Sequence, residues 1–188
     1  MKSLVFATTN RTKFLIAKAV CDDFEINLAN KRLDIVEIQA EDPAAIARDK
    51  AEKAFELLQQ PVVVSDDSWS FAGLNGFPGA YMHSINEWFT PDDFLNLTRP
   101  LKNKHVTLTQ ILVYQDSARQ KIFMAQTQGR LLSEARGHSK HSNHMVITLN
   151  GDGGLSIAEV YDSGRPHSDQ AASKVWHDFA VWFDKNSG

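Results

Sequence analysis

Two hydroxyl groups, one amide and one lysine stand close together near the N-terminus, in a pattern typical of phosphate binding. Thr8, Thr9 and Asn10 follow a short apolar run, and Lys13 falls in the first turn of the helix that we expect next. Free backbone N–H groups at a helix start, together with the helix dipole, favour an anion, and the dipole disfavours a lysine there unless an anion is also present. The segment therefore indicates a phosphate-binding turn. An ordinary strand-to-helix turn with a solvated lysine is the alternative.

A second lysine, Lys50, lies on the apolar face of the helix expected after Asp42. Alanines and Phe55 form that face, and at about 100° per residue Lys50 falls within it whereas Lys53 falls outside. An unpaired buried ammonium group is costly, so a lysine in such a position usually has an anionic partner. A carboxylate of the fold or a bound phosphate would serve, and a lysine at the edge of the face that reaches water is the alternative.

Two adjacent carboxylates, Asp66 and Asp67, come soon after the apolar run at residues 62–64. Open α/β sheets place ligand chemistry at the ends of such buried strands. Together with Glu37, these side chains supply the oxygen ligands that Mg²⁺ prefers, and one of them could activate a water for attack on phosphorus. Capping of a following turn is the alternative.

Histidines recur every three residues at His138, His141 and His144. Imidazoles at this spacing can bind Zn²⁺, but no helix is expected there to align the rings, so a polar loop that faces substrate or solvent is favoured. The single cysteine, Cys21, has no sequence signature for activation. We expect it to be a small buried hydrophobe on its helix.

Extended segments and amphipathic helices alternate along the chain and must position these groups. Apolar runs and period-two patterns predict extended segments at residues 4–6, 33–38 (with Leu33, Ile35 and Val36 facing inward), 62–64 and 155–157, and a hairpin of residues 105–115 and 121–128. Helical spacing and capping residues predict helices after Asn10, from Asp42 to about Gln59, at Pro91 and from Ser168. This mixture predicts an α/β fold with a mixed sheet.

The composition bounds the class of protein. The chain has 188 residues and a formal net charge of −3, which favours a single globular domain over residues 1–188 and argues against a non-specific nucleic-acid binder. No run approaches the roughly 18 consecutive apolar residues of a membrane span. One cysteine cannot form an internal disulfide, which favours a reducing, cytoplasmic location.

Taken in order, these segments resemble the inosine-triphosphate pyrophosphatase family, which acts on non-standard purine nucleoside triphosphates. Residues 6–13 are similar to the family's A-T-x-N-x-x-K loop, and residues 34–39 to its metal-binding glutamate segment. Residues 50–54 are similar to its K-A-x-x-A helix, and residues 61–81 to its P-x-x-x-x-D…L-x-G-x-P-G-x-Y motif. This alignment puts Asp66 at the place of the water-activating aspartate. Residue 65, often acidic in the family, is a serine here.

The resemblance weakens after about residue 136. Where the family has R-G-x-x-x-F-G-Y-D-P, this chain has His141 at the place of the base-stacking phenylalanine and His144 at the place of the aspartate. Residues 166–169, which include His167, replace the S-H-R motif that recognises a 6-keto purine. Base discrimination rests on paired polar groups, so we expect the rewritten half of the site to have lost discrimination while the phosphate half is retained.

The resemblance implies a fold and an assembly. The fold is an elongated mixed β-sheet flanked by helices, in two lobes with a central cleft. The assembly is a homodimer, and exposed aromatic residues such as Trp88 or Phe89 could serve its interface.

The resemblance also implies an activity: hydrolysis of a nucleoside triphosphate, such as (d)ITP or XTP, between its α- and β-phosphates to a monophosphate and pyrophosphate. Asp66 would orient or deprotonate a water, Lys13 and Lys50 would offset phosphate charge, and Glu37, Asp66 and Asp67 would hold Mg²⁺. The implied substrate-binding residues are Thr8, Thr9, Asn10, Ser68, Gly79, His141, His144 and His167.

Two other functions stay open at this point. A nucleotide-binding protein without turnover is favoured by Ser65 and the lost C-terminal motifs, and opposed by the retained lysines and Asp66. The other function is that of a pyrophosphatase with changed base specificity. One such possibility is the related septum-formation-inhibitor group, which prefers pyrimidine nucleotides, but the loop at residues 76–79 argues against it. In each case the expected partner is a small-molecule nucleoside triphosphate, and neither nucleic acid nor membrane is expected.

Overall fold

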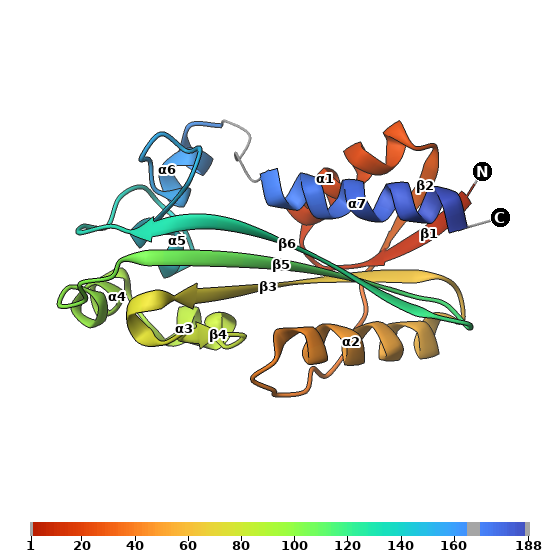
Figure 1. Cartoon of the computed structure of the whole chain (residues 1–188), viewed down its shortest axis with the longest axis horizontal. Helices are drawn as coiled ribbons and strands as arrows, with labels where there is room; N and C mark the ends of the chain where they lie inside the picture. Colours follow the sequence, from red (N-terminus) through yellow and green to blue (C-terminus); the bar gives the residue numbers. More distant parts are fainter. Residues whose placement is uncertain (1, 165–169, 187–188) are drawn as a thin grey trace. The chain divides into compact units, whose positions relative to one another are not determined.

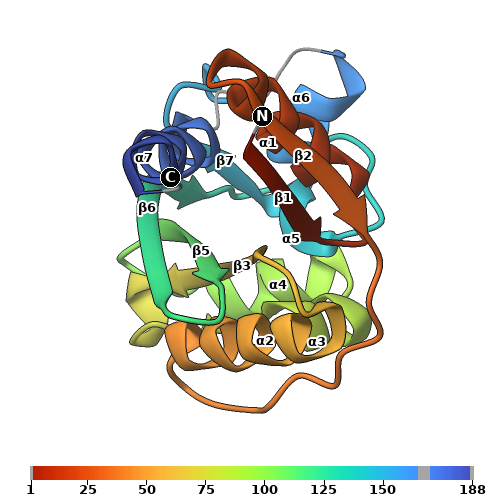
Figure 2. The same ribbon diagram turned by 90° about the vertical axis from the view of Figure 1, so that its right-hand side faces the viewer.

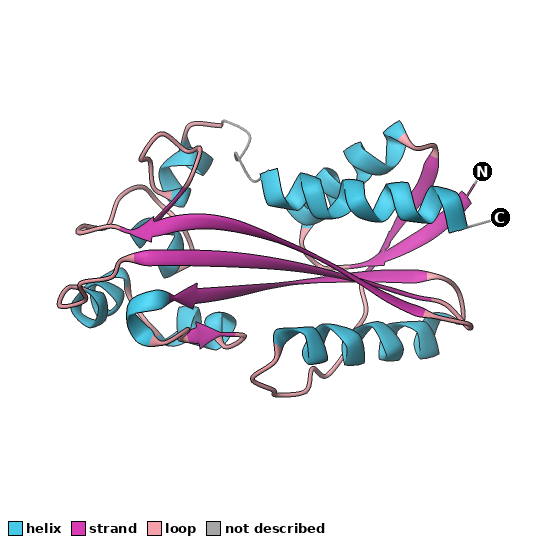
Figure 3. Ribbon diagram, viewed as in Figure 1, coloured by secondary structure: helices cyan, strands magenta, loops and turns pink. Residues whose placement is uncertain are grey.

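The computed structural model describes residues 2–164 and 170–186 (Figure 1). Strands and helices alternate along the chain (Figure 3). They are, in order, β1 (Lys2–Ala7), α1 (Arg11–Asp23), β2 (Ile26–Lys31), α2 (Pro43–Leu58), β3 (Val62–Phe71), the 3-10 turn η1 (Ala72–Leu74), β4 (Pro78–Gly79), α3 (Met82–Trp88), α4 (Pro91–Thr98), β5 (His105–Gln115), β6 (Gln120–Leu131), α5 (Ser142–Val146), β7 (Ile147–Leu149), α6 (Ile157–Asp162) and α7 (Gln170–Asn186).

The chain divides into two compact units. Unit 1 comprises Met1–Asp67, Gln110–Ala125 and Ala171–Gly188, and unit 2 comprises Ser68–Thr109 and Gln126–Gln170. Strands β3, β5 and β6 each contribute one part to each unit. Within the described residues, no helix combines the length and the apolar character that a membrane crossing needs.

Unit 1 contains a sheet with helices on both faces. Its strands are ordered β2-β1-β3-β5-β6, and β1 pairs in parallel with both β2 and β3. Helices α1 and α7 cover one face and α2 covers the other (Figures 1 and 2). Strands that are buried on both faces read as continuous apolar runs, which explains the run at residues 62–64.

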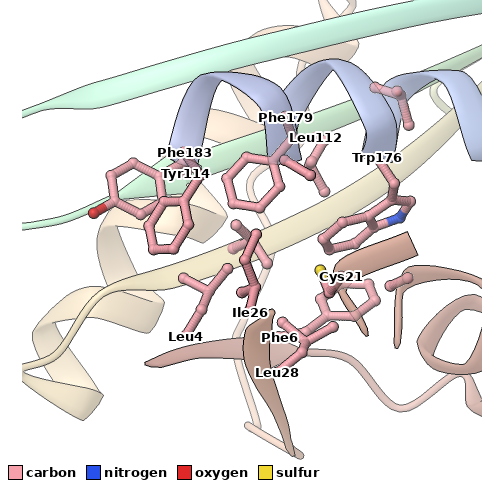
Figure 4. Close-up of a cluster of buried hydrophobic side chains, with 14 of the residues drawn as sticks. Leu4, Phe6, Cys21, Ile26, Leu28, Leu112, Tyr114, Trp176, Phe179 and Phe183 are labelled. Carbon is pink, nitrogen blue, oxygen red and sulfur yellow. The ribbon is translucent and has the colours of Figure 1, made fainter. Parts of the chain in front are cut away.

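The strands of unit 1 send successive side chains into two different cores. Leu4 and Phe6 of β1 pack with α1 and α7 (Figure 4), whereas Val5 and Ala7 pack with the alanines of α2. Cys21 belongs to the first core and is fully buried, and burial raises the pKa of its thiol to about 12. The prediction that Cys21 is a small buried hydrophobe on its helix is therefore confirmed.

Unit 2 has an apolar core of its own. Its strands are ordered β3-β5-β6-β7, with β4 paired to β3, and β7 is antiparallel to β6. Helices α3, α4, α5 and α6 each contribute to this core, through residues that include Ile85, Phe94, Val146 and Ile157.

Several predicted elements are confirmed. They are β1, α1, α2, α4, and the hairpin of β5 and β6. In α2, Asp42 is the N-cap as predicted, since its side chain accepts a hydrogen bond of 2.9 Å from the Ala44 N–H. The apolar face predicted for α7 is buried at Val175, Trp176 and other positions, while its predicted start at Ser168 lies outside the described residues.

The extended segment that was predicted at residues 33–38 is not a strand of the sheet. Residues 32–40 form neither strand nor helix. The strand that pairs with β1 on this side is β2, which was not predicted from the sequence. Leu33 and Ile35 do face inward, against the core on the α2 side. Val36 does not, since it is 83% exposed.

Two further predictions of strand position are wrong. Strand β3 does not end after Val64 but continues to Phe71, so Asp66 and Asp67 lie inside a strand and cap no turn. Residues 155–157 form no strand; Ser156 is instead the N-cap of α6, in a capping box with Glu159. The strand of this region is β7, which lies earlier in the chain.

Candidate functional site

The turn between β1 and α1 is closed by its own polar side chains. Thr8 Oγ1 accepts a hydrogen bond of 3.1 Å from the Asn10 N–H, and Asn10 Oδ1 accepts one of 3.1 Å from the Lys13 N–H. Asn10 is therefore the N-cap of α1, a position that asparagine favours. The cap fixes Lys13 in the first turn, where its Nζ lies 2.8 Å from Asp67 Oδ2. The predicted phosphate turn is thereby joined to the carboxylates of β3.

The segment between β2 and α2 is held against α2 by two lysines. Lys50 Nζ lies 2.5 Å from Glu37 Oε1, and Lys53 Nζ donates a hydrogen bond of 2.9 Å to the Val36 carbonyl oxygen. Lys50 thus has the anionic partner that its position on the apolar face predicted, and in this structure the partner is a carboxylate of the fold.

Asp66 and Asp67 point to opposite faces of the sheet, because they are neighbours in a strand. Burial raises the pKa of Asp66 above its ordinary value, although Lys50, Lys13 and the hydrogen bond of 2.9 Å from the Asp67 N–H all lower it. Glu37 adds to the rise by repulsion. A half-buried carboxylate in the field of two ammonium groups has the environment of a general base.

These groups line one cavity of about 250 Å³ that belongs to unit 1. Its lining residues are Ala7, Thr8, Thr9, Asn10, Lys13, Leu33, Ile35, Glu37, Lys50, Ser65 and Asp66. Every site residue that was predicted in unit 1 lines it except Asp67, which contacts Lys13 instead. The cavity combines two ammonium groups, hydroxyl groups and a half-buried carboxylate, which suits it to bind a polyanion and to activate a water.

Two of the residues predicted to bind the base, His141 and His144, pack together in unit 2. Their ring centroids are 5.1 Å apart, and the ring of Tyr161 lies 5.6 Å from that of His144. Burial lowers the pKa of His141, with further lowering by the nearby charges of Lys140 and His83. The three rings form an aromatic group that sequence reasoning did not foresee in full, since Tyr161 was not among the predicted residues.

The structure gives no direct support for substrate binding by the other predicted substrate residues. Ser68 is a buried residue of β3, and Gly79 lies in β4 with a positive φ of 60°. His167 lies outside the described residues. The roles of these residues stay predictions.

The histidine run offers no metal site in the described part of the chain. Across residues 2–164 and 170–186, no three side chains of His, Cys, Asp or Glu are grouped as a metal ion would require. His138 Nδ1 lies 3.2 Å from Asp162 Oδ2, and His144 Nδ1 lies 3.2 Å from Ser139 Oγ. The zinc alternative therefore has no geometry to support it.

Comparison with known proteins identifies the family. A sequence model of the Ham1 family matches residues 4–176. The chain belongs to the Ham1 family. An inosine triphosphate pyrophosphatase of Ajellomyces capsulatus is 31% identical over 154 residues, which cover 81% of this chain and 82% of that protein. A dITP/XTP pyrophosphatase of Methanopyrus kandleri is 26% identical over 184 residues, which cover 97% of each chain.

Solved structures of Ham1 proteins share the fold. The structure of a Ham1 protein from Coxiella burnetii aligns with a TM-score of 0.79 at 16% identity, covering 98% of this chain and 100% of that one. The predicted α/β fold with a mixed sheet flanked by helices is confirmed, as is the resemblance to the inosine-triphosphate pyrophosphatase family.

Two polar residues of this Ham1-family chain were missed as site candidates. Ser65 is one of the residues that line the cavity of unit 1, and its Oγ is buried without a hydrogen-bond partner among the described residues. In unit 2, the Asn143 side chain is buried beside the histidines and both of its amide atoms lack such a partner. Continuing the period of β3 past Val64 would have placed Ser65 in a buried strand, whereas nothing in the sequence pattern marks Asn143.

Proposed function

We propose that this chain is a nucleoside-triphosphate pyrophosphohydrolase that cleaves a non-standard purine nucleotide, such as (d)ITP or XTP, to a monophosphate and pyrophosphate. The observation that carries the proposal is the cavity of unit 1, where the half-buried Asp66 carboxylate lies in the field of Lys13 and Lys50. Relatives that align over 81% or more of this chain are named as inosine triphosphate or dITP/XTP pyrophosphatases. Membership of this family makes the enzyme a hydrolase of phosphoric anhydride bonds.

The residues of the cavity divide the work between binding and proton transfer. The ammonium groups of Lys13 and Lys50 would contact phosphate oxygens and offset charge that builds up in the transition state. Asp66 would accept a proton from the attacking water, a role for which a raised pKa suits it. The capped turn at Asn10 would present backbone N–H groups to the phosphates.

The oxygen ligands of the site fit a hard cation such as Mg²⁺. Mg²⁺ is usually bound by one or two carboxylates, with waters and substrate phosphates completing its shell. Glu37 and Asp66, which both line the cavity, would supply these carboxylates, whereas Asp67 points to the other face of the sheet. When bound, the ion would neutralise phosphate charge and orient the triphosphate. In the structure, Glu37 and Asp67 are paired with Lys50 and Lys13, and these lysines would exchange the carboxylates for phosphate oxygens as substrate binds.

The proposal is tested by the identity of the products. Phosphorus NMR of reactions with Mg²⁺ and a panel of ITP, XTP, dITP, dUTP and the common nucleotides should show monophosphate and pyrophosphate, with no diphosphate. The nucleotide that turns over fastest identifies the preferred base. Tight nucleotide binding without any product would favour a binding protein, and release of inorganic phosphate would favour a different hydrolase.

We also propose a homodimer in a reducing, cytoplasmic compartment. Trp88 is 73% exposed on unit 2, as an interface residue would be in an isolated chain. Phe89 is partly buried, and its ring centroid lies 5.3 Å from that of Phe94. Light scattering of the wild type should give twice the chain mass, and Trp88→Gln should shift the equilibrium toward the monomer. A wild type that is monomeric at micromolar concentration would contradict the proposal.

A further inference from the structure

Ser65 carries a buried hydroxyl group whose partner the fold does not supply. Its Oγ is shielded from solvent and has no hydrogen-bond partner among the described residues, although Ser65 is one of the residues that line the cavity of unit 1. An unpartnered buried polar atom destabilises a fold, so one that persists calls for an explanation. Its position among the residues that line the cavity suggests a functional one.

Neighbouring polar groups of the cavity already have partners. Thr8 Oγ1 and Asn10 Oδ1 accept the hydrogen bonds that close the turn, and Asp66 Oδ1 accepts one from the Asp67 N–H. The Ser65 hydroxyl is uncharged and can donate a hydrogen bond. A phosphate oxygen attracted by the two lysines would therefore find a hydrogen-bond donor at Ser65 and no repelling charge. The hydroxyl can turn toward a ligand by rotation about a single bond, without movement of the strand.

We infer that Ser65 is a substrate-positioning residue whose hydroxyl donates a hydrogen bond to a phosphate oxygen of the bound nucleotide. This inference rests on the proposed function. This contact differs from those of the lysines. A hydroxyl group on a short side chain fixes the position of the phosphate, whereas the long, flexible side chain of a lysine can move with the phosphate. The unpartnered hydroxyl then destabilises the ligand-free fold, and bound substrate removes this destabilisation.

The two effects of Ser65→Ala on stability and binding should have opposite signs. Removal of the hydroxyl should raise the melting temperature of the ligand-free protein by about 2–4 °C, because it removes an unpartnered buried group. It should also weaken binding of inorganic tripolyphosphate with Mg²⁺ by about tenfold or more, since hydrogen bonds to charged groups are the stronger ones. Calorimetric titration and thermal unfolding with and without tripolyphosphate measure both, and kcat/KM for the nucleotide should fall with the affinity.

Thr148→Val is the matched control. Thr148 Oγ1 is likewise buried and unpartnered among the described residues, but it belongs to β7 in unit 2 and does not line the cavity. This variant should raise the ligand-free melting temperature and leave tripolyphosphate affinity unchanged.

The outcomes separate this inference from the proposed function. If the wild type binds tripolyphosphate and Ser65→Ala binds it equally well, the role of Ser65 is overturned while the phosphate site stands. A lower ligand-free melting temperature in Ser65→Ala would also overturn it, because the hydroxyl would then have a partner in the fold. If the wild type binds no tripolyphosphate at all, the proposed function fails together with the inference.

Discussion

Burial and the charges of nearby lysines change the pKa of the Asp66 carboxylate in opposite directions. Burial raises its pKa, while the ammonium groups of Lys50 and Lys13 lower it, and the rise is the larger effect. A carboxylate of this kind is a stronger base than an exposed aspartate and so takes a proton from water more readily. The same balance makes the ionised form of Asp66 unfavourable for the fold.

Replacing Asp66 with asparagine should therefore stabilise the protein at neutral pH. Because the folded-state pKa is raised, the contribution of Asp66 to stability is fully present below its unfolded pKa and is lost as the pH rises through the folded value. Asparagine does not ionise and escapes this loss. Melting temperatures measured from about pH 3 to pH 8 should favour Asp66→Asn at neutral pH and converge in acid. A variant less stable than the wild type at neutral pH would show that the lysines outweigh burial.

Lys13→Met should weaken substrate binding, because it removes one of the two cations that face the cavity. We expect KM for the nucleotide to rise by about 10- to 100-fold, the range for loss of a hydrogen bond to a charged group. Lys18→Met is the control, since Lys18 lies on the same helix but pairs with Asp22 at 2.7 Å on the exposed side. Equal kinetic effects of the two substitutions would indicate a general effect of charge and would argue against a phosphate contact at Lys13.

At the scale of elements, the cavity depends on how α1 begins. Asn10 ties the helix start to the turn, and the turn presents Thr8, Thr9 and Lys13 on one side of it. Loss of an N-cap side chain costs about 0.5–2 kcal/mol in general.

Asn10→Ala should lower both stability and phosphate affinity, whereas Asn10→Asp should lower affinity alone. Aspartate caps a helix as well as asparagine does, but it adds a negative charge where phosphate would bind. Thr90→Ala, which removes the cap of α4 in unit 2, should lower the melting temperature without changing tripolyphosphate affinity. The account would be contradicted if Asn10→Asp bound tripolyphosphate as tightly as the wild type.

The elements that hold the site were predictable to different degrees. Helix α2 has a strong cap and a clear apolar face, so both its bounds and the position of Lys50 followed from the sequence. Strand β2 was missed because only Ile26 and Leu28 mark it among polar residues. The end of β3 was misplaced because the residues at 65–68 are all polar and read as a loop, although Trp69 and Phe71 continue the buried pattern beyond them. Helix α6 carried a readable signal, the capping box of Ser156 and Glu159, which the strand interpretation overlooked.

At the scale of the whole molecule, each unit is stabilised by its own apolar core. The fold class followed from the alternation of apolar patterns and from the resemblance to the family, and comparison with Ham1 structures confirms it. The pairing of charges in the cavity did not follow from the sequence, because it depends on which face of β3 each aspartate takes. The boundary between the two units was not predicted, because it falls within β3, β5 and β6 rather than in linkers.

Phe179→Ala should be strongly destabilising. Phe179 is fully buried in the core shared by β1, α1 and α7 (Figure 4), and truncation of a buried phenylalanine costs about 3–5 kcal/mol. Leu57→Ala is the control, because Leu57 is exposed on α2 and its truncation should change the free energy of unfolding by no more than about 0.5 kcal/mol. Urea denaturation measures both. Similar losses in the two variants would contradict the description of this core.

The central claim is that Asp66 in the cavity of unit 1 drives pyrophosphate release, and the most direct test is the steady-state rate of that release from ITP with Mg²⁺ for the wild type and Asp66→Asn. The account predicts measurable turnover by the wild type and a fall of about 10²- to 10⁴-fold in a variant that remains folded, the range for loss of a general base. Turnover by a folded Asp66→Asn protein at the rate of the wild type would contradict it.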